Sequence, residues 1–148
     1  MKVKQLIKDE NIFFLKTTDK IYTVNTLIDK ARQLRYVDEV EKFRAAVFKR
    51  ENIVGTGIGF GIALPHVKMD CIDNFFIITG LLENPVNWGA IDNEPVEACF
   101  LIGGPNNDQK QYLEILSGLT LFLKDNSRRD RLFSVKTKKE VLDFINEF

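Results

Sequence analysis

The side chain with the clearest capacity for chemistry is His66, the single histidine of the chain. An imidazole titrates near neutral pH, and its unprotonated ring nitrogen can attack phosphorus as a nucleophile. Arg50 lies upstream, near the end of a predicted helix, and a guanidinium can hold phosphate oxygens through two parallel hydrogen bonds. These residue types favour a phosphoryl-accepting site, although a lone histidine is also compatible with a structural role.

A glycine-rich segment, 54–66, leads into this histidine and contains four of the nine glycines: Gly55, Gly57, Gly59 and Gly61. Glycines form tight turns and can expose backbone N–H groups to phosphate oxygens. The spacing misses the dinucleotide motif Gly-x-Gly-x-x-Gly, because the third glycine comes one residue too early and Pro65 opposes the helix that should follow. A Gly-Lys-Ser/Thr sequence is also missing. We therefore predict short strands and turns, and no nucleotide site.

The overall composition indicates a globular protein without a nucleic-acid partner. The 148 residues include 21 basic and 21 acidic side chains, so the formal net charge is zero, whereas nucleic-acid binding usually requires a basic excess. We interpret Arg128, Arg129 and Arg131 as the solvated face of a helix. No run approaches 18 apolar residues, so membrane insertion is not expected. Residues 1–9 lack the apolar core of a secretory signal, so a cytoplasmic location is expected.

The two cysteines do not indicate a metal centre. Cys71 and Cys99 are well separated and have no companion histidine cluster, so no metal is expected. Cys99 lies in the apolar run 96–102 and is predicted to be a buried packing residue. For Cys71, which is close to His66 in sequence, a reactive thiol is the alternative to a packing role.

Helices and strands alternate along the chain. A helical period of apolar residues predicts helices over 1–8, 20–34, 38–51 and 108–124. Ser127 and Thr137 are predicted N-caps of two further helices. Apolar runs predict strands over 11–15, 75–82 and 96–102, with turn chemistry over 84–94.

These elements predict one α/β domain over residues 1–148, built on a mixed β-sheet with helices on both faces. Gly103, Gly104 and Pro105 are expected to end the strand before them. Pro65 is expected to end the strand over 61–64, which would leave His66 just past a strand end, at the rim of the sheet.

Two long segments resemble one protein family. Residues 50–66 contain Arg50-Glu51, then the glycine run, then Ala63-Leu64-Pro65-His66. This looks like the active-site motif of the enzyme IIA domains of the fructose/mannitol class, which belong to the bacterial phosphoenolpyruvate-dependent sugar phosphotransferase system. Residues 87–96, NWGAIDNEPV, are similar to the family's Asp-Phe-Gly-Ala-Leu-Asp-Gly-Lys-Pro-Val. The resemblance covers essentially the whole chain.

The resemblance implies a phosphotransferase that carries a phosphoryl group on a histidine. His66 matches the histidine that accepts the group from the carrier HPr and passes it to an enzyme IIB domain. Arg50 matches the arginine that helps to bind the phosphoryl group, and Thr56 and Tyr112 are further phosphoryl-binding candidates. The family fold is a mixed sheet between helices, and neither a metal nor a cofactor is implied.

Two positions depart from the family pattern. The family usually has a small residue after the histidine, where this chain has Val67, which is expected to put a bulky group beside the docking surface. The family often has a second histidine early in its long helix, where this chain has Tyr112. A tyrosine can donate a hydrogen bond to phosphate but does not exchange a proton at neutral pH.

Three roles are compatible with these residues. The first is a regulatory protein of the nitrogen-related enzyme IIA branch, in which the phosphorylation state of the histidine selects the partner; the missing second histidine favours it. The second is a transport component that feeds an enzyme IIB. The third is an interaction module that is never phosphorylated. The residues indicate neither a sugar nor an oligomeric state.

Overall fold

The computed structural model describes residues 2–53 and 55–147 of the chain. Its helices are α1 (Lys2–Leu6), α2 (Lys20–Gln33), α3 (Val40–Ile53), α4 (Gln109–Leu123), α5 (Asn126–Ser134) and α6 (Lys138–Asn146), with a 3₁₀ turn, η1 (Asp9–Asn11). Its strands are β1 (Ile12–Leu15), β2 (Gly57–Gly59), β3 (Ile62–Ala63), β4 (His66–Lys68), β5 (Phe76–Val86) and β6 (Val96–Gly104). Val54, the first residue of the predicted glycine-rich segment, lies outside the described residues.

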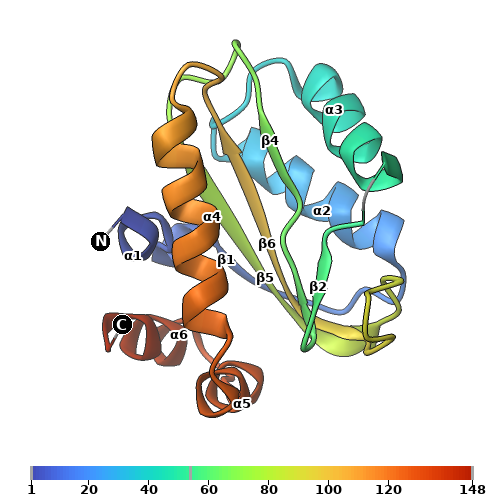
Figure 1. The fold of residues 1–148 in the computed structure, drawn as a ribbon, viewed down its shortest axis with the longest axis vertical. Coiled ribbons are helices and arrows are strands. Elements are labelled where there is room, and N and C mark those ends of the chain that lie inside the picture. The colour runs from blue at the N-terminus through green and yellow to red at the C-terminus, as the bar shows by residue number, and fades with distance from the viewer. Residues whose placement is uncertain (1, 54, 148) are drawn as a thin grey trace.

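These strands form one mixed sheet in the order β1-β5-β6-β3-β2, and β4 also pairs with β6. The central pair, β5 and β6, is antiparallel, whereas β1 runs parallel to β5, and β3 and β4 run parallel to β6. Figure 1 shows α4, α5 and α6 on one side of the sheet and α2 and α3 on the other. The predicted fold class, a mixed sheet flanked by helices on both faces, is therefore confirmed.

Each face of the sheet has its own hydrophobic core, because successive residues of a strand point to opposite faces. Ile77, Phe100 and Ile102 pack on the side of α1, α4, α5 and α6. Ile78 and Leu101 pack on the side of α2 and α3. Burial on both faces explains why the central strands are almost continuously apolar.

Both central strands extend further than the sequence predicted. β5 continues to Val86, through part of the predicted turn region, and β6 continues through Gly103 and Gly104. A Cβ atom at Gly104 would lie 2.1 Å from the ring of Phe75, and one at Gly103 would lie 2.4 Å from the ring of Phe76. The two glycines are therefore strand residues that make room for aromatic rings, not strand breakers.

The strand predicted over 61–64 does end before Pro65, since β3 stops at Ala63, but the chain rejoins the sheet directly after the proline. The Pro65 carbonyl accepts a hydrogen bond from the N–H of Ile102 at 2.8 Å, and β4 continues beside β6 with His66 opposite Ile102. A proline lacks the N–H donor but keeps its acceptor, which is all that this edge position uses. His66 is thus fixed by sheet pairing and is not on a loop past the sheet.

The C-terminal helices correct two more predictions. Asp125, not Ser127, caps α5, since its carboxylate accepts from the N–H of Arg128 at 3.0 Å. Arg129 is buried, not solvated, and its guanidinium donates to the carbonyls of Leu123 and Lys124 at the end of α4. Thr137 caps α6 as predicted.

Candidate active site around His66

His66 is half-buried at the first position of β4, and its two ring nitrogens have different partners. Nδ1 lies 2.6 Å from the carbonyl oxygen of Leu64. A carbonyl oxygen only accepts hydrogen bonds, so Nδ1 carries the proton and Nε2 keeps its lone pair in the neutral ring. Burial lowers the pKa of His66, and the positive charge of Arg50 lowers it further, while the bond to Leu64 opposes both. The imidazole is therefore neutral at physiological pH, with Nε2 available as a nucleophile.

Arg50 reaches Nε2 of His66 from α3, which lies on the opposite side of the sheet from α4. It lies in the last turn of α3, and its Nη2 atom is 3.3 Å from Nε2 of His66. A guanidinium has only donors, so Nη2 donates to the Nε2 lone pair. The structure thus brings together His66 and Arg50, which were paired from the sequence. The guanidinium places its positive charge beside the nitrogen that would carry a phosphoryl group.

Tyr112 approaches His66 from α4. The centroids of their rings are 5.8 Å apart, and the ring of Phe75 stacks on Tyr112 at 6.3 Å. Burial raises the pKa of Tyr112 to about 12. The phenol therefore keeps its proton at neutral pH and can act only as a neutral hydrogen-bond donor or acceptor, as the sequence analysis expected.

Lys68 is a site residue that sequence reasoning missed. Its Nζ atom lies 4.9 Å from the centroid of the Tyr112 ring and donates a hydrogen bond to Oε1 of Gln109. Val67, between the two, is only 7% exposed and packs in the core on the α2–α3 side. The expectation that Val67 stands beside a docking surface is therefore wrong. Two-residue alternation along a strand would have placed Lys68 on the same face as His66.

Thr56 supports the histidine through its backbone. Its carbonyl accepts from the N–H of Leu64 at 2.9 Å, and Leu64 in turn holds Nδ1 of His66. The Thr56 hydroxyl is buried and has no hydrogen-bond partner among the residues that the structure describes. No described contact joins that hydroxyl to His66, so direct phosphoryl binding by Thr56 stays a prediction.

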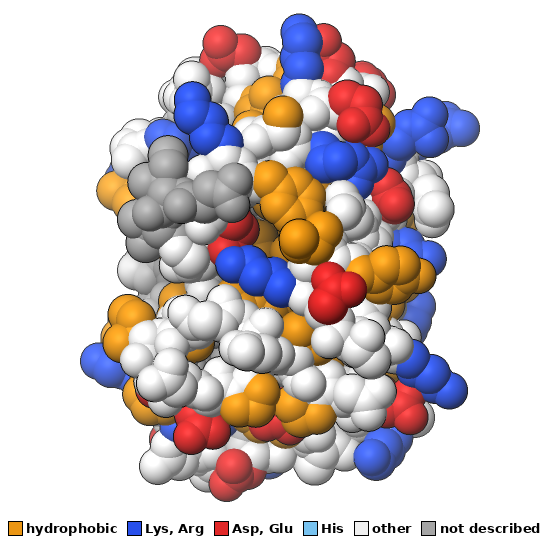
Figure 2. Space-filling model, turned by 90° about the vertical axis from the view of Figure 1, so that its right-hand side faces the viewer, with side chains coloured by type: hydrophobic (Ala, Val, Ile, Leu, Met, Phe, Trp, Pro, Cys, Tyr) orange, Lys and Arg blue, Asp and Glu red, His pale blue; other side chains and the backbone are white. Residues whose placement is uncertain are grey.

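An ion pair between a buried carboxylate and a partly exposed lysine anchors this backbone. The Glu51 carboxylate accepts from the N–H of Thr56 at 3.2 Å and lies 2.8 Å from Nζ of Lys20. The same lysine lies 5.6 Å from the centroid of the Trp88 ring. Sequence reasoning missed Lys20, since a lysine at the start of a helix gives no local sign of a buried partner. Figure 2 shows the side of the molecule that carries α2 and α3, where basic and acidic side chains intermix.

The glycines before His66 shape turns, and their contacts do not reach the imidazole. Gly59, Phe60 and Gly61 have φ angles of +92°, +61° and +79°, a left-handed turn that glycine adopts without steric cost. The N–H of Phe60 donates to the Asp92 carboxylate at 2.8 Å. The backbone cradle predicted from the glycine run is therefore not shown by these contacts.

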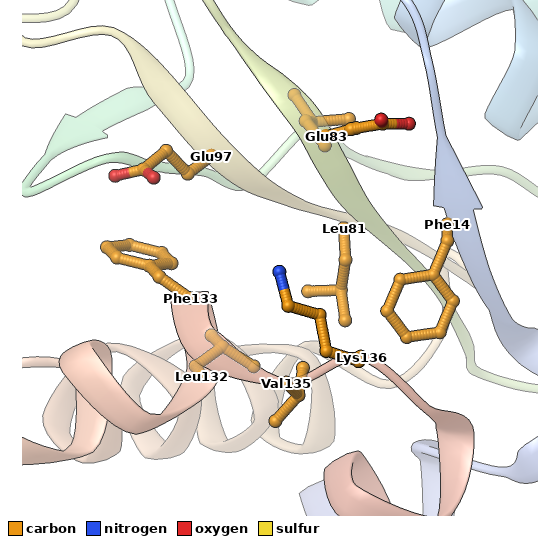
Figure 3. Close-up of a pocket in the computed structure, with 9 residues that line it drawn as sticks. Phe14, Leu81, Glu83, Glu97, Leu132, Phe133, Val135 and Lys136 are labelled. Carbon is orange, nitrogen blue, oxygen red and sulfur yellow. The ribbon is translucent and has the colours of Figure 1, made fainter.

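The site is distinct from a cavity that lies near the C-terminal helices. A cavity of about 320 Å³ lies between the sheet and the α5–α6 connection. Figure 3 shows Lys136 pointing into it between Phe133 and Leu81. Glu97, which also lines it, lies near the start of β6, whereas His66 pairs close to the other end of that strand.

Residues 2–53 and 55–147 contain neither a metal-binding cluster nor a membrane-spanning helix. No group of three or more histidine, cysteine, aspartate or glutamate side chains could hold a metal ion. No helix in this part of the chain has the length and apolarity to cross a membrane.

Cys99 is fully buried as predicted, and burial together with a hydrogen bond to Glu39 raises the pKa of Cys71. A raised pKa argues against a reactive thiolate at Cys71.

Three relatives of known name match large parts of this sequence. The fructose-specific EIIA component of Haloferax volcanii is 29% identical over 124 residues, which is 84% of this chain and 80% of that protein. A nitrogen regulatory protein of Bradyrhizobium diazoefficiens is 27% identical over 133 residues, 89% of this chain and 86% of that protein. The fructose-specific EIIABC component of Bacillus subtilis is 28% identical over 99% of this chain, which spans only 23% of that relative's length.

Two solved structures share the fold. The crystal structure of IIA-Ntr from Neisseria meningitidis has a TM-score of 0.89 at 23% identity, covering 97% of this chain and 98% of that chain. The IIA mannitol enzyme of Escherichia coli, solved in complex with phosphorylated enzyme IIB, has a TM-score of 0.81 at 24% identity, covering 94% and 96%. Residues 5–148 also match the family described as phosphoenolpyruvate-dependent sugar phosphotransferase system, EIIA 2. The chain therefore belongs to the EIIA 2 family, as its resemblance predicted.

Proposed function

We propose that this EIIA 2 protein is a cytoplasmic phosphoryl carrier that accepts a phosphoryl group from an HPr-like donor on Nε2 of His66. The single observation that carries the proposal is the division of roles between the two ring nitrogens. Nδ1 donates to the Leu64 carbonyl, and Nε2 directs its lone pair toward Arg50. A neutral imidazole held in one tautomer, beside a guanidinium, is suited to attack phosphorus.

The transfer step balances without a metal or an added base. The Nε2 lone pair forms the new N–P bond, the bond between phosphorus and the donor breaks, and its electron pair leaves with the donor. The Nδ1 proton stays in place, and the Leu64 carbonyl stabilises the positive charge that the ring gains. Arg50 releases Nε2 as the donor's phosphorus approaches, which frees the lone pair for attack, and turns its N–H groups to the phosphoryl oxygens.

A regulatory role is the function we favour for the phosphorylated protein. The similarity to a nitrogen regulatory protein over 86% of that protein supports it. So does Tyr112, which stays a neutral phenol where the family often has a second imidazole. In this role, addition of about two negative charges at His66 would change which partner surface docks.

A transport role is the second candidate. The similarity to a fructose-specific EIIA component over 80% of that protein supports it. The complex of the mannitol enzyme IIA with phosphorylated enzyme IIB suggests the acceptor class. In this role, His66 would pass its phosphoryl group to an enzyme IIB domain.

Phosphorylation can be tested with phosphoenolpyruvate, enzyme I and HPr, followed by intact-mass measurement. We expect one acid-labile phosphate on the wild-type protein and none on His66→Ala. No mass gain in the wild type would refute both roles and leave an unphosphorylated interaction module. If phosphate is gained, addition of a fructose-class enzyme IIB separates the roles: rapid loss of phosphate supports transport, and retention supports regulation.

A further inference from the structure

We propose that Lys68 is a second phosphoryl-binding cation of this site, held on Tyr112 and Gln109 until a phosphoryl group is attached to His66. This inference rests on the proposed function and adds a residue to it. The sequence motif before His66 does not include Lys68, and the observation behind the proposal is where the structure places its ammonium group.

The strand geometry gives His66 and Lys68 a common face. Val67 packs into the core on the α2–α3 side, so the residues before and after it on β4 point to the α4 side. Their Cα atoms are about 6.6 Å apart, at roughly 3.3 Å per residue of strand. The flexible four-carbon stem of a lysine can cover such a separation.

Both side chains lie against the same aromatic ring. The centroid of the Tyr112 ring is 5.8 Å from that of His66 and 4.9 Å from Nζ of Lys68. The ammonium group also donates a hydrogen bond to the amide oxygen of Gln109. Both partners are neutral at physiological pH, because the phenol has a pKa of about 12 and an amide does not titrate in this range.

A phosphoryl dianion would compete strongly for this lysine. The described salt bridges include no carboxylate paired with Lys68. Hydrogen bonds between an ammonium and an anionic oxygen are about twice as strong as those between neutral groups. A phosphoryl group on His66 is therefore expected to draw Nζ away from the Gln109 amide.

A second cation, on the α4 side of the site, would stabilise the charge of a phosphoryl group further. A phosphoryl group adds about −1.5 to −2 charges, and Arg50 supplies one positive charge from the α3 side. Because Tyr112 stays neutral, it cannot supply the second charge from the α4 side. Lys68 is the cation that the structure places against that tyrosine.

The inference can be tested by ³¹P NMR titration of the phosphorylated protein, with variants Lys68→Met, Lys68→Arg and the control Lys110→Met, an exposed lysine of α4. Removal of a cation near an anion raises the pKa of that anion, by about one unit at this range. We expect Lys68→Met to raise the pKa of the phosphoryl group and slow phosphorylation about tenfold. Lys68→Arg should keep the phosphoryl pKa and the phosphorylation rate close to their wild-type values, and Lys110→Met should leave both unchanged.

A further variant separates binding from support of the fold. Gln109→Ala removes the hydrogen-bond acceptor of Lys68 but keeps the lysine. We therefore expect the pKa of the phosphoryl group to stay within about 0.3 units of the wild-type value, which is much less than the shift of about one unit expected when the cation is removed. If Gln109→Ala reproduced the effects of Lys68→Met, or if Lys68→Met left pKa and rate unchanged, the role of Lys68 would be refuted while His66 phosphorylation stood. A wild-type protein that gained no phosphate would overturn the proposed function and this inference together.

Discussion

Replacement of Arg50 by methionine is expected to slow phosphorylation of His66 by about 10- to 100-fold. The Nη2 atom of Arg50 lies 3.3 Å from the nitrogen that would bond to phosphorus, so its N–H groups are positioned for the charge that develops there. A hydrogen bond to a charged group contributes about 1.5–3 kcal/mol, and each 1.36 kcal/mol in the barrier changes the rate tenfold. Arg50→Lys keeps the charge but loses the planar fork, so an intermediate rate is expected.

Rapid-quench measurement of phosphate transfer from phosphorylated HPr tests this prediction. Lys49→Met is a matched control, because Lys49 is exposed on the same turn of α3. Unfolding in urea would verify that each variant is folded. An Arg50→Met rate within twofold of the wild type, with Lys49→Met equally active, would show that the guanidinium plays no part in transfer.

Three further outcomes follow from the structure. Burial lowers the pKa of His66, so the rate of His66 phosphorylation should stay constant through neutral pH and fall only below about pH 6.5, the ordinary pKa of histidine. A rate that already falls above pH 6.5 on acidification would contradict the neutral, buried imidazole. Lys20→Met should destabilise the protein by about 3 kcal/mol in urea unfolding, because it leaves the buried Glu51 carboxylate without its cation; an unchanged midpoint would mean that the pair contributes little. Gly104→Ala should cost about 1–3 kcal/mol, since its methyl group would overlap the ring of Phe75, and a stability equal to the wild type would show that this ring moves freely.

Much of the fold follows from local patterns. The apolar period of 108–124 predicts α4, and the structure begins that helix after Asp108, whose carboxylate accepts from the N–H of Gln111. The apolar runs predict β5 and β6, because strands covered on both faces need no polar alternation. His66, Arg50 and Tyr112 were predicted as one site, and the structure brings the latter two to the imidazole from opposite sides of the sheet.

The errors arise where a specific side-chain or backbone contact decides the local structure. Gly104 stays in a strand because Phe75 occupies the space of a side chain. The chain rejoins the sheet after Pro65, where Ile102 donates to the proline carbonyl. Arg129 is buried because the carbonyls that end α4 need donors. Phe75 and Ile102 are distant in sequence from the residues they contact, and the carbonyls that Arg129 reaches lie five and six residues before it. Composition and periodicity identify none of these contacts.

The most direct test of the central claim is to identify the phosphorylated nitrogen. Long-range ¹H–¹⁵N NMR of the phosphorylated protein, labelled at its single histidine, distinguishes the two ring nitrogens. The structure predicts phosphate on Nε2 of His66, with Nδ1 still protonated and bonded to the Leu64 carbonyl. Phosphate on Nδ1, or on a residue other than His66, would contradict it.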